Sequence, residues 1–180
     1  MEKVFITGTG RCGTTFLIKM FSFLEFHTGY TRETYKRWTA TPCNSGMEQK
    51  YGSEFYIVKS PTILADIGPI SQDPKIKIKA VIIPIRDYDA AAASRVKLGR
   101  QNGGLWNAQD KPTQIAFYHK IMANYMHHMV KNEINTIFLD FEKMTTDKLY
   151  LYKKLEFLWS EKNITFERFS AVYDEVSATC

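Results

Sequence analysis

The chain of 180 residues has a formal net charge of +5 and a pI of about 9.0. Hydrophobic residues make up 44% and charged residues 24%, which is ordinary for a folded domain and excludes an intrinsically disordered chain. The basic residues are scattered, so a nucleic-acid-binding tail is not expected, and the charge indicates either anionic partners or a solvated basic surface.

The cysteines and the N-terminus indicate the compartment. Cys12, Cys43 and Cys180 are odd in number and form no CxxC pair, so we expect neither a disulfide framework nor a zinc site. Free cysteines are typical of a reducing compartment. The first residues resemble a strand, without the apolar region of a signal peptide, and no apolar stretch reaches membrane-spanning length. We therefore expect a cytoplasmic protein without a membrane partner.

The expected elements alternate between strand and helix along the chain. Short apolar runs predict buried strands at residues 4–7, 55–58, 79–85 and 135–141. Helices are expected at residues 14–25, from Pro61, at 90–98, at 112–131 and from 142 onward. Residues 26–53 and 99–111 are expected loops, and long excursions are often functional. This order predicts one α/β domain over residues 1–180, with a mostly parallel sheet covered by helices on both faces and a ligand site beyond the carboxyl ends of the strands.

Two local signals refine the third strand and the helix after it. Pro84 has no N–H group, so it should lie where the strand ladder ends or at a sheet edge. Asp87 or Asp89 can cap the following helix, because a carboxylate accepts hydrogen bonds from the first N–H groups of a helix.

The stretch from Gly8 to Thr15 lies between the first expected strand and helix and predicts an oxyanion site. Glycines let the backbone turn tightly and direct N–H groups inward, and the helix N-terminus adds a partial positive charge. The spacing fits a Walker A loop, but Thr14 stands where ATP- and GTP-binding proteins have lysine, and the fixed cation is Arg11. The alternative is a glycine-rich turn without a ligand.

Arg86 and Ser94 predict a second anion site. Arg86 leaves the 79–85 strand, and Ser94 follows about two turns into the next helix, so the two side chains can converge on one anion. Alone, the two residues are better explained as a surface arginine and a helix-interior serine. Together with the loop, they indicate two phosphate sites on one nucleotide.

At these motifs the chain resembles the sulfotransferase family. Residues 11–17 (RCGTTFL) resemble its 5′-phosphosulfate loop, with Cys12 in place of the usual serine. Arg86 with Ser94 resembles its 3′-phosphate motif, with Tyr88 in place of the usual proline. Residues 58–61 (VKSP) resemble its Lys-x-Pro segment. Weaker likenesses occur at residues 103–106, 139–142 and 157–158, so the resemblance spans most of the chain.

The resemblance implies a three-layer, P-loop NTPase-like fold and 3′-phosphoadenosine 5′-phosphosulfate as donor, with adenosine 3′,5′-bisphosphate as product and no metal. It implies a small-molecule, carbohydrate or peptide acceptor and no nucleic-acid partner. The residues that match its donor site are Gly10, Arg11, Cys12, Gly13, Thr14, Thr15, Arg86 and Ser94.

In-line transfer to an acceptor hydroxyl or amine needs cations at the leaving oxygen and a proton acceptor. Arg11 and Lys59 are the candidate cations, although Lys59 is also explained as an exposed strand-end lysine. Glu48 is the candidate base, because residues 45–48 resemble a segment of bacterial members and Glu48 lies only eleven positions before Lys59. His27 is the second candidate, and either residue is also explained as an ordinary surface side chain.

Two other functions remain open at this stage. A P-loop kinase or NTPase is the first, because residues 137–140 (IFLD) resemble a Walker B strand. The missing Walker lysine and the pair of Arg86 and Ser94 argue against it. A non-catalytic nucleotide-binding protein of the same fold is the second, and the presence of both Arg11 and Lys59 argues against that alternative.

Overall fold

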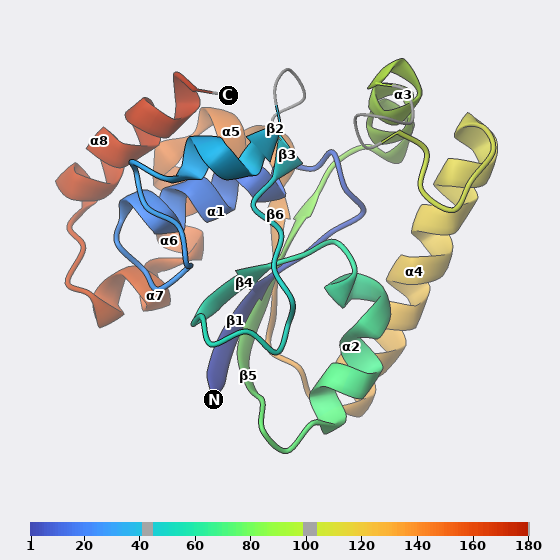
Figure 1. The fold of residues 1–180 in the computed structure, drawn as a ribbon, viewed down its shortest axis with the longest axis horizontal. Coiled ribbons are helices and arrows are strands. Elements are labelled where there is room, and N and C mark those ends of the chain that lie inside the picture. The colour runs from blue at the N-terminus through green and yellow to red at the C-terminus, as the bar shows by residue number, and fades with distance from the viewer. Residues whose placement is uncertain (41–44, 99–103, 180) are drawn as a thin grey trace.

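The computed structural model describes residues 1–40, 45–98 and 104–179. At its centre, an all-parallel sheet has the strand order β4-β1-β5-β6 (Figure 1). The strands are β1 (Glu2–Ile6), β4 (Ile57–Lys59), β5 (Lys77–Ile85) and β6 (Thr136–Asp140). They are short and rich in β-branched and aromatic residues, a composition that suits a sheet buried on both faces.

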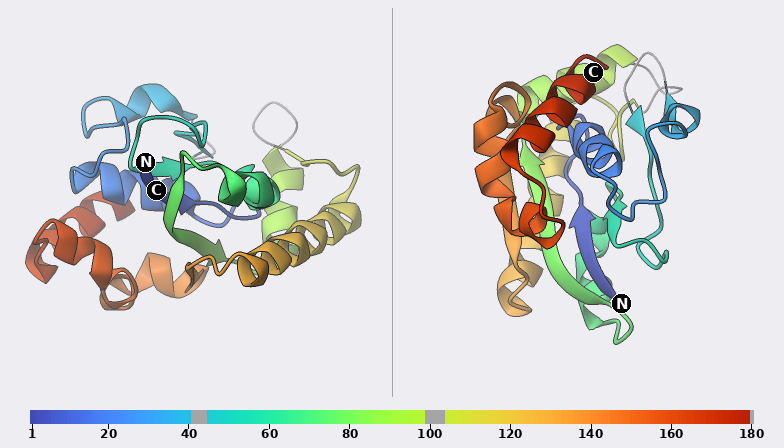
Figure 2. Two further views of the ribbon diagram at one scale, coloured as in Figure 1. Left: turned by 90° about the horizontal axis from the view of Figure 1, so that it is seen from below. Right: turned by 90° about the vertical axis from the view of Figure 1, so that its left-hand side faces the viewer.

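Helices cover both faces of this sheet and give three layers (Figure 2). One face carries α1 and the C-terminal helices, whereas the other carries α2 and α4, with α3 packed against α4. The helices are α1 (Thr14–Phe23), α2 (Ile63–Gln72), α3 (Tyr88–Leu98), α4 (Lys111–Lys131), α5 (Phe141–Thr146), α6 (Lys148–Lys154), α7 (Glu156–Glu161) and α8 (Phe166–Ser177).

Alternate residues of β1 belong to two separate cores. Val4 and Ile6 pack with α1 and α8, whereas Phe5 packs with α2 and α4, and all three are fully buried. Neighbouring residues of a strand point to opposite faces, so β1 is enclosed on both sides. Burial of each such side chain stabilises the fold by roughly 1.5–3 kcal/mol. The loop after β1 therefore begins from a firmly packed strand.

The segment between α1 and β4 is mostly irregular and returns to the sheet beside β4. Its short elements are a 3-10 helix, η1 (Tyr35–Trp38), and a hairpin of β2 (Thr39–Ala40) and β3 (Ser45–Gly46). The buried ammonium of Lys3 donates to the carbonyls of Ser53 and Phe55. The Gln49 N–H donates to the Lys59 carbonyl at 2.9 Å. The segment therefore contacts the sheet both at the start of β1 and at the carboxyl end of β4.

The order and type of the expected strands and helices are confirmed. Asp87 accepts a 2.8 Å hydrogen bond from the Ala90 N–H, as a cap of α3 should. Pro84 lies in an interior strand but beyond Ile82, the last residue of β5 that pairs with β1. The expected loop at 26–53 contains η1 and the hairpin, which its sequence does not predict. Residues 99–103 of the second expected loop lie outside the described residues, as do Cys43 and Cys180.

The strand order creates a switch point between β1 and β5. From β1 the chain proceeds to β4 on one side and then crosses to β5 on the other. In parallel sheets, ligands bind in the crevice at the carboxyl ends of the strands that flank such a point. No helix in the described ranges has the length and apolar character needed to cross a bilayer.

Candidate active site

The loop between β1 and α1 adopts a conformation that requires glycine at two positions. Gly10, Arg11 and Gly13 have left-handed φ angles of 80°, 59° and 86°. A Cβ atom on Gly10 would lie 2.0 Å from Nη2 of Arg95. A Cβ atom on Gly13 would lie 2.5 Å from the side chain of Met144. The backbone conformation and the neighbouring side chains therefore both select glycine here.

The N-terminus of α1 begins directly after this loop. In the described part of the chain no side chain caps it, and the Leu17 N–H donates to the Gly13 carbonyl at 3.2 Å. The N–H groups that precede Leu17 lie at the position where a helix N-terminus binds an anion. Of the two threonines in this turn, Thr14 is half-buried and Thr15 is buried. The geometry fits the predicted oxyanion site.

Three of the predicted anion-binding side chains meet at the loop. Arg11 donates from Nε to Ser94 Oγ at 3.1 Å. Arg86 donates from Nη1 to the Arg11 carbonyl at 2.9 Å, and its guanidinium lies over the Phe141 ring, 4.7 Å from the centroid. The loop after β1, the end of β5 and α3 are therefore joined by hydrogen bonds. Cationic groups from two segments gather at the switch point.

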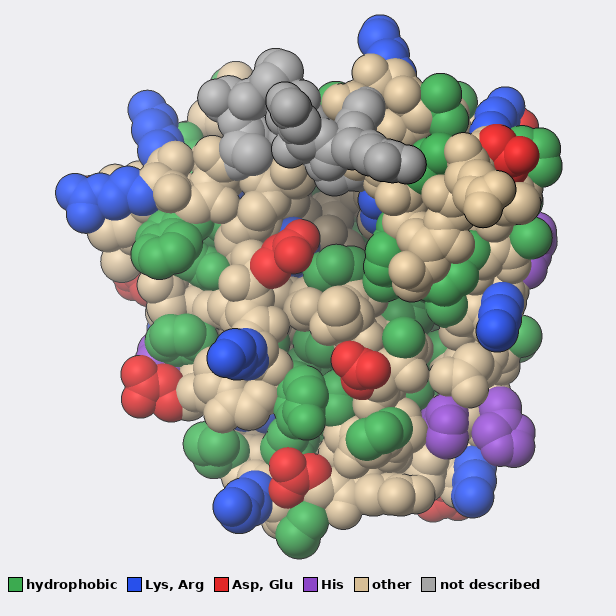
Figure 3. Space-filling model, turned by 45° about the vertical axis from the view of Figure 1, so that its right-hand side comes forward, with side chains coloured by type: hydrophobic (Ala, Val, Ile, Leu, Met, Phe, Trp, Pro, Cys, Tyr) green, Lys and Arg blue, Asp and Glu red, His purple; other side chains and the backbone are tan. Residues whose placement is uncertain are grey.

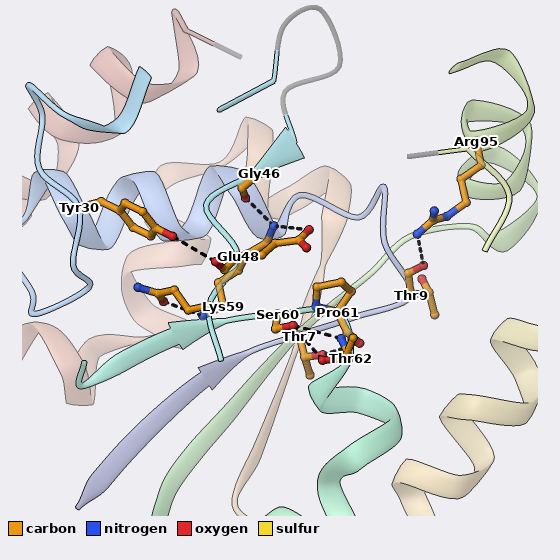
Figure 4. Close-up of polar contacts among 11 residues, drawn as sticks. Thr7, Thr9, Tyr30, Gly46, Glu48, Lys59, Ser60, Pro61, Thr62 and Arg95 are labelled. Carbon is orange, nitrogen blue, oxygen red and sulfur yellow. Dashed lines mark hydrogen bonds and ion pairs between the residues drawn. The ribbon is translucent and has the colours of Figure 1, made fainter. Parts of the chain in front are cut away.

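Arg95 holds the outer side of the same loop, and its role is not evident from the sequence. Its guanidinium is buried and donates to the Thr9 carbonyl at 3.3 Å (Figure 4). It also donates to the Gly104 carbonyl at 2.8 Å. It also lies over the Trp106 ring, whose edge contacts Phe117. Trp106 is half-buried and packs, with Phe117, against the core on this face of the sheet.

Thr7 joins the start of the loop to the segment after β4. Its hydroxyl accepts a hydrogen bond from the Leu64 N–H at 3.0 Å and donates to the Pro61 carbonyl at 3.4 Å. Ser60 and Thr62 also share a hydroxyl hydrogen bond of 3.0 Å in this segment. These contacts fix the residues that follow Lys59 relative to the end of β1 (Figure 4).

Cys12 points into the interior of the loop. Its side chain is fully buried, and its Sγ would lie 2.6 Å from a Cβ atom on Gly8. Burial raises the pKa of the Cys12 thiol. The thiol is therefore not an exposed nucleophile.

Lys59 and Glu48 form an ion pair at the end of β4 (Figure 4). The Lys59 ammonium lies 3.3 Å from Glu48 Oε1 and donates to the Gly46 carbonyl at 2.7 Å. The Lys59 side chain is 3% exposed, so the interpretation as an exposed strand-end lysine is wrong. Burial lowers the pKa of Lys59, and the Glu48 carboxylate opposes that effect. The predicted approach of Glu48 to Lys59 is observed.

The Glu48 carboxylate is half-exposed and lines a cavity of about 880 Å³. Most of the wall comes from the irregular segment between α1 and β4, and the rest from the residues after β4. Figure 3 shows one face of the molecule, which is hollowed, with an acidic side chain at the edge of the hollow and basic atoms inside it. Residues of the long 26–53 excursion therefore line a cavity beside Glu48.

His27 lies apart from these residues. Its carbonyl accepts hydrogen bonds from the N–H groups of Tyr56 and Ile57, at the amino end of β4. It lines a different cavity, together with Glu161 and Lys162. The loop, Arg86 and Lys59 all lie at the carboxyl ends of their strands, so the structure does not bring His27 to the site.

No protein-family model matches this sequence, and no significant match to a curated protein is found. Within the ranges that the structure describes, no group of three or more His, Cys, Asp or Glu side chains is arranged to hold a metal ion. The geometry of the site therefore carries the functional assignment.

Proposed function

We propose that this chain is a P-loop sulfotransferase that moves the sulfuryl group of 3′-phosphoadenosine 5′-phosphosulfate to a hydroxyl or amine acceptor. The observation that carries the proposal is the meeting of Arg11, Arg86 and Ser94 at the loop between β1 and α1. Cations from two segments beside a helix N-terminus suit a ligand with two separate phosphate groups. An interior β1 followed by a glycine loop and a helix supports a P-loop NTPase-like fold.

The donor's two ends would bind to different parts of this cluster. The N–H groups of the loop from Gly10 to Thr15 would bind the 5′-phosphosulfate at the start of α1. Arg86 and Ser94 would bind the 3′-phosphate, and Arg11, which contacts Ser94, would lie between the two anions. A hydrogen bond to a charged group contributes roughly 1.5–3 kcal/mol, enough for each arginine to affect donor affinity strongly.

Lys59 and Glu48 would serve the transfer itself. A bond forms between the acceptor oxygen and sulfur while the bond from sulfur to the bridging oxygen breaks, and adenosine 3′,5′-bisphosphate leaves. Lys59 would stabilise the negative charge that develops on the bridging oxygen, with Arg11 as the second cation. Glu48 would accept the acceptor's proton. The ion pair between Glu48 and Lys59 supports these roles, because the carboxylate and the ammonium lie 3.3 Å apart.

A P-loop kinase or NTPase is the rival enzyme, and two observations disfavour it. Thr14 occupies the position of the Walker lysine. Asp140, which a Walker B strand would use for magnesium, instead accepts the Lys143 N–H at 2.8 Å and caps α5. A non-catalytic nucleotide-binding protein would not need the buried, paired Lys59, which is costly to desolvate.

Thermal shift separates these functions. Adenosine 3′,5′-bisphosphate should raise the melting temperature, and ATP with Mg²⁺ should not, because a ligand that binds only the native state stabilises it by mass action. Stabilisation by ATP with Mg²⁺, but not by adenosine 3′,5′-bisphosphate, would support the kinase. Stabilisation by adenosine 3′,5′-bisphosphate without sulfuryl transfer to any acceptor in a broad panel would support the non-catalytic protein.

A further inference from the structure

The outer edge of β4 is closed by one residue of the irregular segment, Gln49. β4 is an edge strand, and alternate residues of a parallel strand bond to each neighbour, so Ile57 and Lys59 direct their main-chain groups away from β1. The Gln49 N–H donates to the Lys59 carbonyl at 2.9 Å, and the Lys59 N–H donates to Gln49 Oε1 at 3.3 Å. A single glutamine therefore pairs with Lys59 as a neighbouring strand would.

The far end of the Gln49 side chain is bonded to the segment that follows α1. Its Nε2 donates to the carbonyl of Thr28, which is fully buried and whose hydroxyl lies 2.8 Å from that of Ser22 in the last turn of α1. The amide thus directs its oxygen at an N–H group and its nitrogen at a carbonyl. A carboxylate offers acceptors alone and a thioether offers no N–H donor, so a carboxamide suits both partners. The three hydrogen bonds of Gln49 form a clamp between the end of β4 and the end of α1.

This clamp carries the two candidate residues of the transfer step. Glu48 directly precedes Gln49, and its carbonyl accepts a hydrogen bond from the Tyr30 hydroxyl at 3.3 Å (Figure 4). The Glu48 carboxylate is 52% exposed, and within the described residues Lys59 is its one ion-pair partner. An ion pair with an exposed member is a weak constraint, because water competes for the charge and the side chain loses entropy. The approach of Glu48 to Lys59 therefore depends on the main-chain bonds that Gln49 makes.

We infer that Gln49 is a positioning residue of the candidate active site: the clamp holds the main chain of Glu48 against β4, so that its carboxylate stays beside the Lys59 ammonium. Sites of this kind keep their geometry through hydrogen bonds made by residues behind the reacting groups. The inference rests on the proposed function for the chemistry of Glu48 and Lys59, whereas the clamp is a property of the fold.

Lysine acetylation by acetic anhydride, quantified residue by residue with mass spectrometry, tests the clamp without a nucleotide. Gln49→Met keeps the length of the side chain and removes both polar atoms of the amide. Lys59, whose side chain is 3% exposed, should react about tenfold faster in this variant, because fewer hydrogen bonds keep its covering segment closed. Lys19, 1% exposed in α1, is the internal reference, since a general loss of stability would accelerate the reaction of both lysines. Gln72→Met, at an exposed position, is the control variant.

Sulfuryl transfer gives a second readout: turnover of Gln49→Met should fall about tenfold, with unchanged affinity for adenosine 3′,5′-bisphosphate. Gln49→Asn, whose amide is one methylene too short to reach from Lys59 to Thr28, should behave in the same way and decides the test if Gln49→Met does not fold. Acetylation of Lys59 at the wild-type rate, or in step with Lys19, would overturn the inference, as would full turnover in a variant with a reactive Lys59. If Lys59 reacts as expected and the wild type transfers no sulfuryl group, the clamp stands and the sulfotransferase proposal fails.

Discussion

Arg86 donates a 2.9 Å hydrogen bond to the main-chain carbonyl of Arg11, and so joins the end of β5 to the loop after β1. A guanidinium already held in place loses little conformational freedom when an anion arrives, so more of the interaction free energy is available for binding. The proposed donor site is therefore largely preorganised by contacts to the backbone.

Gly10→Ala should disrupt the loop. The left-handed φ of 80° and the contact of 2.0 Å with Arg95 both oppose a Cβ atom, so we expect a loss of roughly 1–3 kcal/mol in stability and loss of nucleotide binding. Gly52→Ala is the matched control, because a Cβ there meets nothing within 4 Å. Thermal unfolding and calorimetry measure both effects. Normal nucleotide affinity in Gly10→Ala would show that the loop does not bind the donor.

Lys59→Met should separate activity from stability. The unbranched apolar side chain fits a buried position and removes the cost of burying an ammonium, so the melting temperature should not fall. Turnover in sulfuryl transfer should fall about 10²–10³-fold, with a much smaller change in the affinity for adenosine 3′,5′-bisphosphate. Lys75→Ala removes an exposed lysine before β5 and serves as control. Full turnover together with a raised dissociation constant for the donor would show that Lys59 contributes to donor binding and not to transfer.

Glu48→Gln keeps the shape of the side chain and removes its basicity. Turnover should fall roughly 10²–10⁴-fold, because the acceptor's proton would then lack an acceptor. Glu54→Gln, an identical change at an exposed site in the same segment, should leave turnover unchanged. Steady-state kinetics on a hydroxyl acceptor makes the comparison. Equal turnover of the two variants would remove Glu48 from the mechanism.

Tyr125 should make the fold sensitive to alkaline pH. Its hydroxyl is buried and lies 2.6 Å from Thr136 Oγ1, and burial raises the pKa of Tyr125 to about 12. An unfolded tyrosine titrates near pH 10, so only the folded state retains the proton between about pH 10 and 12. The contribution of this group to the free energy of unfolding therefore falls across that window, by roughly 2–3 kcal/mol at most. At neutral pH, Tyr125→Phe should cost about 1 kcal/mol through the lost hydrogen bond.

Melting temperatures measured from neutral to alkaline pH test this. The curves of the wild type and Tyr125→Phe should converge above pH 10, whereas the control Tyr51→Phe, at an exposed site, should run parallel to the wild type. Parallel curves for Tyr125→Phe would contradict the prediction.

The sequence predicts the sheet and its helices well, because burial produces strong local patterns. The runs around Phe5 and Ile82 are apolar enough to identify buried strands. The alternation of strands and helices then restricts the chain to a parallel sheet. The hairpin of β2 and β3 was not predicted, because its strands are two residues long and their pairing depends on contacts such as that between Met47 and Trp38.

For the site, sequence motifs identify positions but not all of the contacts between them. Ser94 was predicted from its spacing to Arg86, and its partner in the structure is the Arg11 side chain. The sequence does not predict that Arg95 binds the loop, because an arginine on an alanine-rich helix is typical of an exposed surface position. Only the tertiary structure shows that its guanidinium is buried against the Thr9 carbonyl.

Calorimetric titration with adenosine 3′,5′-bisphosphate and with AMP tests the central claim most directly. The two ligands differ in the 3′-phosphate that Arg86 and Ser94 would bind. The wild type should bind the bisphosphate at least about tenfold more tightly than AMP, and Arg86→Ala should abolish most of that difference while leaving AMP affinity nearly unchanged. Equal affinities of the wild-type protein for the two nucleotides would contradict a 3′-phosphate site and, with it, the proposed sulfotransferase.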